Sequence, residues 1–354
     1  MAYTTINDGS ANFQAAIYTG NSSTQSVVNG GNSNLQPDLV WTKCRSNTSN
    51  NFLFDSTRGV TKQLHSDTTD LEGTNATGLT AFNTDGWTMG NTGGMNFNNQ
   101  TYVGWQWKAN GGTTASNTDG SITSTVQANT TAGFSIISYT GNGSNGATIG
   151  HGLSQTPQLF IPKCLSTATN WEMYYFPTGG TKQYGYLNLT NGFSTWSYTA
   201  PTSTTIGLSG SGDSNGNGRT MIGYAFHSVK GYSQIGTYKG NGSGSYGGPL
   251  IYTGFKPAFV LTKEISTASD TYQWGIRDNQ RSPYVNSMPA NKALYPNSTA
   301  VENDHGVNGM FFTSNGFKPN TTNAHTNGNN LDYFYAAFAS NPFVTSTGQP
   351  NTAG

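Results

Sequence analysis

One seven-residue pattern occurs three times in the chain and constrains the fold more than any other feature. It consists of Pro, any residue, three apolar residues, one further residue and Lys. The copies are "PDLVWTK" at 37–43, "PQLFIPK" at 157–163 and "PAFVLTK" at 257–263, in steps of 120 and 100 residues. A repeat at this scale defines the unit that folds, so it has to be identified before any single element.

Two further segments recur with each copy. A Tyr-x-Gly-Asn-x-Ser segment precedes the Pro by 19, 18 and 19 residues, beginning at Tyr18, Tyr139 and Tyr238. An aromatic segment ends each copy, as "YVGWQWK" at 102–108, "MIGYAFH" at 221–227 and "YFYAAFA" at 333–339. Such regular spacing predicts three related units in tandem.

The recurring segments place unit 1 at residues 1–112, unit 2 at 134–232 and unit 3 at 233–343. Residues 113–133 are polar and poor in apolar side chains, so we expect a linker or an extended surface arm there. No such stretch separates units 2 and 3, so we expect these two to pack directly together. Residues 344–354 are expected to form a polar tail.

Each unit is made of short apolar runs between turns rich in Gly and Asn. No window of about 11 residues or more shows a convincing helical period. Closely spaced short strands are typical of an all-β sandwich or barrel, and the units are far longer than a propeller blade. We therefore predict an all-β fold of three related antiparallel β-sandwich units, of lectin or jelly-roll type, in tandem.

Alternation along the strands predicts which faces are buried. Val103, Trp105 and Trp107 share one face of the ending segment of unit 1, and units 2 and 3 are apolar at the same positions. The opposite face carries small residues such as Gly104 and Gly223, which indicates close coverage by another layer. The Pro-to-Lys segments are apolar on both faces, as interior strands are. We expect Pro to begin each strand and Lys to end it, reaching solvent or a carboxylate.

The charge of the chain excludes several classes of partner. Charged residues make up 9% of the sequence and the formal net charge is zero, so no basic field attracts nucleic acid or a membrane surface. No apolar run is long enough to predict membrane insertion, and the first residues lack the pattern of a secretory signal. We expect synthesis in the host cytoplasm and exit by another route, such as inside a virus particle released by lysis.

No residues have the spacing of a catalytic or zinc site. The five histidines include no pair at metal-ligand spacing, and G-x-S-x-G, P-loop and C-x-x-C motifs are absent. Cys44 and Cys164 occupy equivalent positions of units 1 and 2, and we expect no disulfide between them. The glutamates that could serve as glycosidase carboxylates share no motif position across units; they are Glu72, Glu172, Glu264 and Glu302. We expect a protein without catalysis and without a cofactor.

One segment resembles half of a calcium loop. Asp213, Asn215 and Asn217, followed by Gly218, match its first positions. The second half fails, because Tyr224 stands where a Glu is needed. A polar hairpin turn is the alternative interpretation, since all three units carry such a segment before the ending strand.

Units 1 and 3 share an Asp-x-x-Arg motif that unit 2 lacks. Its residues are Asp55 with Arg58 and Asp278 with Arg281. In so uncharged a chain, we expect these groups to pair across strands with Lys43 and Lys263, in a structural role. A role in ligand binding is the alternative.

Tryptophans could stack on sugar rings at exposed positions. Alternation assigns Trp41, Trp105 and Trp107 to the core. Trp196, in "NGFSTWSYT", is the best candidate for an exposed glycan platform, and the others are Trp87 and Trp171. Packing within the core is the alternative for each.

The repeats resemble a family found in tailed bacteriophages of marine bacteria. The segments that carry the resemblance are "YTGNGSNGATIGHGL", "PQLFIPK", "NTDGSITSTVQANTTAGFSI", "LFDSTRG", "YVGWQWK", "FQAAIYTGNSSTQSV" and "YFYAAFASNPF". The resemblance covers nearly the whole chain. It implies a virion structural or tail-fibre-like protein with lectin-like β-sandwiches, and it implies no catalytic residue.

Two functions follow as expectations. The first is a tail-fibre or adhesin-type protein that recognises a glycan on the host cell. The alternative is a capsid decoration, head-fibre or cement protein that docks to other virion proteins. Tail fibres are commonly homotrimers, but three units in one chain could instead form a pseudo-threefold body alone.

Overall fold

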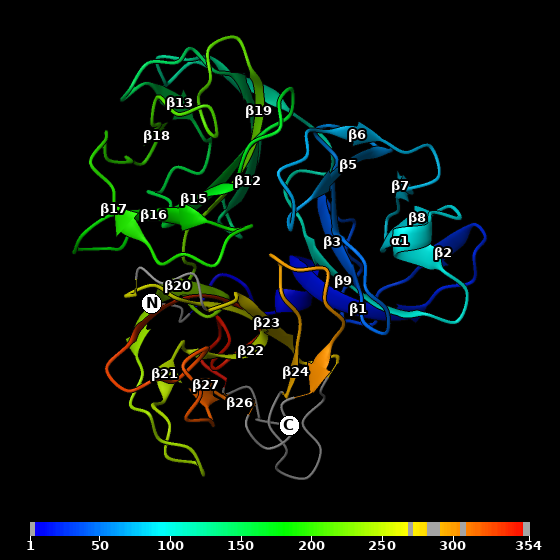
Figure 1. Ribbon diagram of the computed structural model, residues 1–354, viewed down its shortest axis with the longest axis vertical. Coiled ribbons are helices and arrows are strands. Elements are labelled where there is room, and N and C mark those ends of the chain that lie inside the picture. The colour runs from blue at the N-terminus through cyan, green and yellow to red at the C-terminus, as the bar shows by residue number, and fades with distance from the viewer. Residues whose placement is uncertain (1–3, 268–271, 282–290, 305–308, 350–354) are drawn as a thin grey trace.

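The computed structural model describes residues 4–267, 272–281, 291–304 and 309–349 of the chain. Its elements are almost all antiparallel strands, with one 3-10 turn, η1 (Gly9–Ala11), and one single-turn helix, α1 (Gly93–Asn96). Figure 1 shows the strands as three groups around a common centre, with unit 1 in blue, unit 2 in green and unit 3 in yellow to red. No helix in the described ranges is long and apolar enough to cross a membrane.

Each unit contributes one main sheet, and the central strand order is the same in all three. In unit 1 it is β1 (Phe13–Thr19), β9 (Thr101–Trp107), β3 (Leu39–Cys44), β4 (Asn51–Asp55), β5 (Lys62–His65) and β6 (Gly73–Thr74). In unit 2 it is β10 (Ala115–Asn117), β11 (Ser124–Asn129), β12 (Phe134–Thr140), β19 (Thr220–Phe226), β14 (Leu159–Cys164), β15 (Glu172–Tyr175), β16 (Gln183–Tyr186) and β17 (Ser194–Thr195). In unit 3 it is β20 (Ser233–Lys239), β28 (Asp332–Pro342), β22 (Phe255–Glu264) and β23 (Gly275–Asp278). The Pro-to-Lys strands β3, β14 and β22 therefore lie between the ending strands and β4, β15 and β23.

A smaller sheet accompanies each main sheet, so the architecture is sandwich-like. The small sheets are β2 (Gln25–Val27), β8 (Trp87–Met89) and β7 (Leu79–Phe82); β13 (Thr148–Gly150) and β18 (Thr205–Gly207); and β21 (Ile251–Tyr252), β27 (Gly316–Pro319) and β26 (Met310–Thr313). A short pair, β24 (Lys292–Ala293) and β25 (Asn303–Asp304), follows β23. The predicted close coverage of Gly104 is confirmed, since a Cβ there would lie 2.4 Å from the Trp87 ring.

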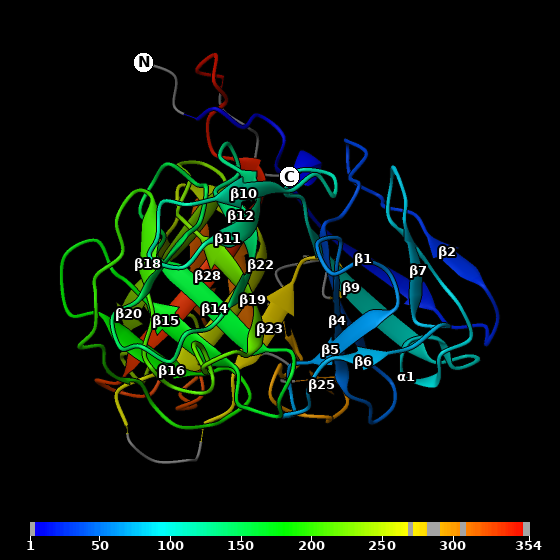
Figure 2. The same cartoon turned by 90° about the horizontal axis from the view of Figure 1, so that it is seen from above.

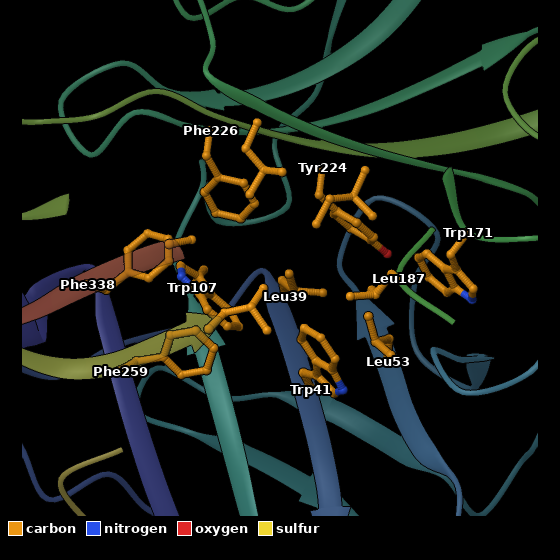
Figure 3. A pocket seen from close by; sticks show the side chains of 14 residues that line it. Leu39, Trp41, Leu53, Trp107, Trp171, Leu187, Tyr224, Phe226, Phe259 and Phe338 are labelled. Carbon is orange, nitrogen blue, oxygen red and sulfur yellow. The ribbon is translucent and has the colours of Figure 1, made fainter. Parts of the chain in front are cut away.

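The inward faces of the three main sheets form one shared core. Equivalent residues of the three units meet there, among them Leu39, Leu159 and Phe259. The Trp107 ring contacts Phe226 of unit 2 and Phe338 of unit 3, with ring centroids 6.2 and 5.5 Å apart. Figure 3 shows these side chains around a residual space of about 30 Å³. The predicted core face of Val103, Trp105 and Trp107 is confirmed, because all three are buried.

Backbone hydrogen bonds close the units into a ring. In each bond the acceptor is the carbonyl group of the second residue after the Lys of a Pro-to-Lys strand. The donor belongs to a different unit in each case. Glu72 N donates to Leu165 O at 3.0 Å, Phe193 N to Ile265 O at 3.1 Å, and Glu302 N to Arg45 O at 2.9 Å. Unit 1 thus bonds to unit 2, unit 2 to unit 3, and unit 3 back to unit 1. These bonds join the three units in a closed ring within one chain.

Residues 113–133 differ from the expected linker, because they contain β10 and β11. These strands extend the main sheet of unit 2 beside β12, as Figure 2 shows. Alternating side chains explain the pairing: Ser124 and Val126 are buried, whereas Thr125 between them is exposed. The polar composition of these residues indicated a linker, although part of the segment forms a half-buried strand. Of the expected C-terminal tail, residues 350–354 lie outside the described residues.

Candidate functional site

The lysines that end the repeated strands are buried, so the prediction that they reach solvent or a carboxylate is wrong. Lys43 Nζ donates to Ser49 O, and Lys163 Nζ donates to Thr169 O at 2.6 Å and to Thr69 O of unit 1 at 3.0 Å. Lys263 Nζ donates to Glu264 O and to Thr190 O of unit 2, both at 2.8 Å. The two cross-unit bonds lie where a loop of the preceding unit covers the strand end. Burial lowers the pKa of each lysine to about 8.

These lysines predict that stability rises between pH 8 and pH 10. Each has a pKa of about 8 when folded and about 10.5 as a free side chain, so the unfolded chain binds more protons in this window. The free energy of unfolding then rises with pH, by at most about 1.4 kcal/mol per lysine per pH unit, and this gain is lost as pH falls through the folded pKa. At higher pH the buried Tyr224 acts in the opposite direction, because burial raises its pKa well above the usual value.

Urea unfolding at a series of pH values checks this expectation. Lys163→Met keeps the apolar chain and removes the titrating amine, so its stability should rise less steeply with pH than that of the wild type. Lys230→Met is the matched control, since Lys230 is exposed. Parallel pH curves for wild type and Lys163→Met would contradict the expectation.

The Asp-x-x-Arg motifs form buried ion pairs of their own, so their predicted pairing with Lys43 and Lys263 is also wrong. Arg58 Nε donates to Asp55 Oδ2 at 2.5 Å, and Arg281 Nε donates to Asp278 Oδ2 at 2.6 Å. The Asp and Arg side chains are at most 4% exposed. Because the Asp and the Arg of each pair lie three residues apart in sequence, each ion pair closes a single turn.

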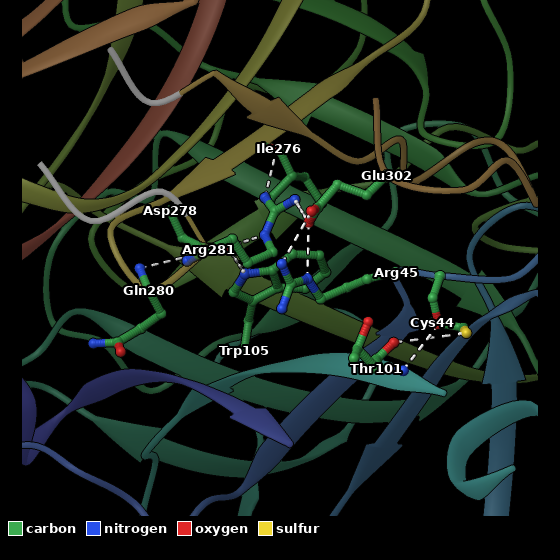
Figure 4. A network of polar contacts seen from close by, with 10 residues as sticks. Cys44, Arg45, Thr101, Trp105, Ile276, Asp278, Gln280, Arg281 and Glu302 are labelled. Atoms are coloured by element: carbon green, nitrogen blue, oxygen red, sulfur yellow. Dashed lines mark hydrogen bonds and ion pairs between the residues drawn. The ribbon is translucent and has the colours of Figure 1, made fainter. Parts of the chain in front are cut away.

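Each ion pair is completed by donors from another unit. Tyr224 Oη of unit 2 donates to Asp55 Oδ2, and Trp105 Nε1 of unit 1 donates to Asp278 Oδ2, both at 2.8 Å. Figure 4 shows Arg281 above the Trp105 ring and bonded to Glu302, which also binds Arg45.

Two glutamates, contrary to the expectation, occupy equivalent positions. Glu72 lies 3.2 Å from Arg58 Nη1, and Glu302 lies 3.1 Å from Arg281 Nη1. Both carboxylates are paired with the Arg of the Asp-x-x-Arg motif of their own unit, and the backbone N–H of each glutamate donates to a carbonyl of another unit.

The structure explains why unit 2 lacks the motif. Strand register makes Tyr175 of unit 2 equivalent to Asp55 and Asp278. The residue of unit 3 equivalent to Trp105 and Tyr224 is Ala336, which has no side-chain donor. A buried carboxylate without that donor would be costly. Tyr175 instead packs its ring on Phe334, 5.2 Å away.

The three tryptophans predicted as glycan platforms are all buried, so that prediction is wrong. Trp87 and Trp171 have no exposed surface, and Trp196 is 5% exposed. Trp171 Nε1 donates to His65 O of unit 1 at 2.8 Å. The Trp196 ring lies 4.1 Å from that of Tyr174, under the small sheet of unit 2. The polar residues next to these tryptophans in the sequence gave no sign of the contacts, because the contacting residues are distant in the sequence.

The calcium-like segment serves as a clamp on the Tyr-x-Gly-Asn-x-Ser loop. Asn215 accepts from Asn142 N at 2.9 Å and donates to Asn142 Oδ1 and Ser144 O. Asp213 Oδ1 accepts from Asn170 N at 2.9 Å, and Asn217 is exposed. The three side chains therefore do not converge on one point, and the described residues include no group of three His, Cys, Asp or Glu suited to a metal.

The same clamp occurs in the other two units. Asn96 accepts from Asn21 N at 2.8 Å, and Asn327 accepts from Asn241 N at 3.0 Å. The recurring Gly of each loop is required by close packing, since a Cβ at Gly141 would lie 2.4 Å from Gly216 O. The polar hairpin alternative is wrong as well, because the flanking strands β18 and β19 belong to different sheets and do not pair with each other.

The most enzyme-like polar cluster is enclosed. Glu172 accepts hydrogen bonds from Tyr174 Oη at 2.7 Å and Ser211 Oγ at 3.1 Å, and burial raises its pKa. Glu172 is 3% exposed, so its carboxylate is enclosed by protein. His151, also buried, has its pKa lowered to about 4 by burial, and His305 lies outside the described residues.

An open groove of about 790 Å³ lies between units 2 and 3. One wall is formed by the segment after β15, and the other by β20 and the start of the small sheet of unit 3. The lining of the groove includes Tyr175, Pro177, Thr178, Gln234, Thr237 and Tyr252. Among its described lining residues Lys230 carries the one charge. A hollow of about 300 Å³ continues it past Gln183 towards Ser266.

Sequence reasoning missed this groove, because it forms between two units and neither segment carries a motif. The one available signal was the absence of a segment like β11 before β20. The chain runs from the ending strand of unit 2 into unit 3 without residues to cover that edge.

Comparison with known proteins gives one match. The family model described as a domain of unknown function, DUF7483, matches residues 8–342. No curated protein and no solved structure matches the chain.

Proposed function

Since this chain belongs to the DUF7483 family, whose description states no activity, we propose a function from the groove between units 2 and 3: a non-catalytic protein of a virus-particle surface that docks to other particle proteins. The resemblance of the repeats to virion proteins of tailed bacteriophages supports the location. The groove supports the mode of action.

The neutral, open lining of the groove is the observation that carries the proposal. Most of its lining residues are uncharged and many are small, and Thr178 and Thr237 among them are exposed. Such a surface offers hydrogen bonds and shape rather than charge or reactive groups. A surface with few charges fits protein association, since the central part of protein interfaces is depleted in charged residues.

Glycan recognition is the second candidate function, and one observation favours it. Tyr252, 57% exposed, lines the same groove beside Gln234 and Thr178. An exposed aromatic face next to neutral hydrogen-bonding groups suits a sugar ring. It ranks second because the tryptophans on which the glycan expectation rested are buried.

Electron microscopy of intact particles tests the docking function. We expect density for the chain on the particle surface, with a neighbouring protein seated between units 2 and 3. Thr178→Arg places a charge in the groove and should lower incorporation at least tenfold. Thr195→Arg, at an exposed position outside the groove lining, is the matched control.

Three results would contradict the proposal in different ways. Particles without the chain would exclude the virion location. Normal incorporation of Thr178→Arg would exclude the groove as the docking site. Binding to an oligosaccharide array that is abolished by Thr178→Arg, with the chain at a tail tip, would establish glycan recognition instead.

A further inference from the structure

The outer edge of β20 borders the groove, and no strand of the described residues pairs with it. β20 is the last strand of its sheet and pairs with β28 in the register Ser233 to Phe338. Gly240 N donates to Leu331 O and Ala339 N to Tyr232 O, so the even-numbered residues bond to β28. In an antiparallel ladder the alternate residues then point away from that strand.

Three of the outward groups are already bonded, and one of them is Ser233 O, which accepts from Val229 N at 3.1 Å. Ser233 N donates to Val229 O, and Ile235 N donates to Ser228 Oγ at 3.0 Å. These bonds confirm the outward direction of the odd-numbered residues. The N–H and C=O of Thr237 and Lys239 point the same way, and no described strand pairs with them. Thr237 itself lines the groove.

Unit 2 shows what an occupant of this edge looks like. β12 is the equivalent of β20, since Phe134 pairs with Phe226 as Ser233 pairs with Phe338. β11 pairs along the whole of β12, from Phe134 with Asn129 to Tyr139 with Ser124. An unpaired edge of this kind is a template for one more strand.

The side chains of β11 indicate which sequence fits. Val126 and Ser124 are buried against the small sheet of unit 2, and Gln127 fills the space towards unit 1. Gln127 bonds there to Thr57 Oγ1 at 2.9 Å and to Ser56 Oγ at 3.0 Å. At the β20 edge the neighbouring unit is unit 2, and its residue equivalent to Thr57 is Pro177. An occupant of the β20 edge therefore needs a small or apolar residue at the position of Gln127.

We propose that the groove accepts an extended, uncharged, Ser/Thr-rich segment of another particle protein, which adds to β20 as an antiparallel strand. Main-chain bonds to Thr237 and Lys239 supply affinity, and alternate side chains enter the spaces beside Pro177 and Tyr252. This mode of recognition is β-strand addition. The inference rests on the proposed docking function and names the chemistry of its partner.

A peptide taken from this chain is the probe. A labelled peptide with the sequence of residues 121–131, "SITSTVQANTT", with Gln127→Val to suit Pro177, should bind saturably with one site per chain. A second peptide that also carries Thr125→Pro should bind at least tenfold more weakly. In β11 the N–H of Thr125 faces the neighbouring strand, and proline has no such N–H. Fluorescence anisotropy gives both affinities, and amide exchange at Thr237 should slow only with the first peptide.

Two variants of the chain separate main-chain from side-chain contacts. Thr237→Pro removes the outward N–H at an edge position where Pro is tolerated, and should weaken binding at least tenfold. Thr237→Val keeps the N–H and should bind within about twofold of the wild type, and thermal unfolding checks that both variants are folded. Equal binding by Thr237→Pro, or absence of peptide binding by the wild type, would overturn strand addition.

The outcomes distinguish this inference from the docking function. If the peptide fails to bind but Thr178→Arg still prevents incorporation into particles, docking stands and strand addition is wrong. Dimers of the chain in sedimentation, formed through β20, would overturn the proposed partner. Binding of oligosaccharide and not of peptide in the groove would overturn it as well.

Discussion

Arg281→Met should lower the free energy of unfolding by about 3–5 kcal/mol, as expected when one partner of a buried ion pair is removed. Arg281 has no exposed side-chain surface, and its guanidinium contacts Asp278, Glu302 and Ile276 O. The variant leaves the Asp278 carboxylate buried beside Trp105 without its cation. Urea unfolding followed by circular dichroism measures the loss.

Two comparisons isolate the buried charge as the cause. Arg45→Met removes another ion pair of the same Glu302, but Arg45 is 19% exposed, so its loss should cost only about 1 kcal/mol. Asp278→Asn combined with Arg281→Met removes both charges and keeps an acceptor for Trp105. It should be more stable than Arg281→Met alone. A double variant that is less stable than the single one would show that lost packing, not the unpaired charge, dominates.

Trp107→Ala should also cost about 3–5 kcal/mol, and it should destabilise all three units together. Trp107 is 3% exposed and lies among Phe13, Phe226, Phe259 and Phe338, which come from all three units. Because the core is shared, tryptophan fluorescence and circular dichroism should report one coincident unfolding transition in the wild type, and an earlier coincident transition in the variant.

Trp107→Phe is the matched control. It keeps an aromatic ring and removes an indole N–H that is buried without a hydrogen-bond partner among the described residues. We expect a loss of about 1 kcal/mol, because the lost volume is partly offset by removal of an unsatisfied donor. Separate transitions of the two probes would contradict a single shared core.

The candidate site shows where sequence reasoning reached its limit. Alternation placed Trp41, Trp105 and Trp107 in the core, because a strand's own pattern records which face is buried. The same reasoning could not place Trp196, whose burial depends on Tyr174 and the small sheet of unit 2. The groove beside β20 was likewise invisible, since it is formed by two units and by the absence of a strand.

The sequence pattern alone predicts the antiparallel β-structure, a repeat in three copies and the inward aromatic faces. These follow from period-two patterning and from recurring turn residues, which act within a few positions of the chain. Three features are visible only in the folded molecule: the three units close into a ring, Lys43, Lys163 and Lys263 are buried, and β20 has an edge with which no described strand pairs. Ring closure and the bonds of Lys163 and Lys263 depend on contacts between units, where one unit's loop supplies carbonyl groups that the other unit's sequence does not contain.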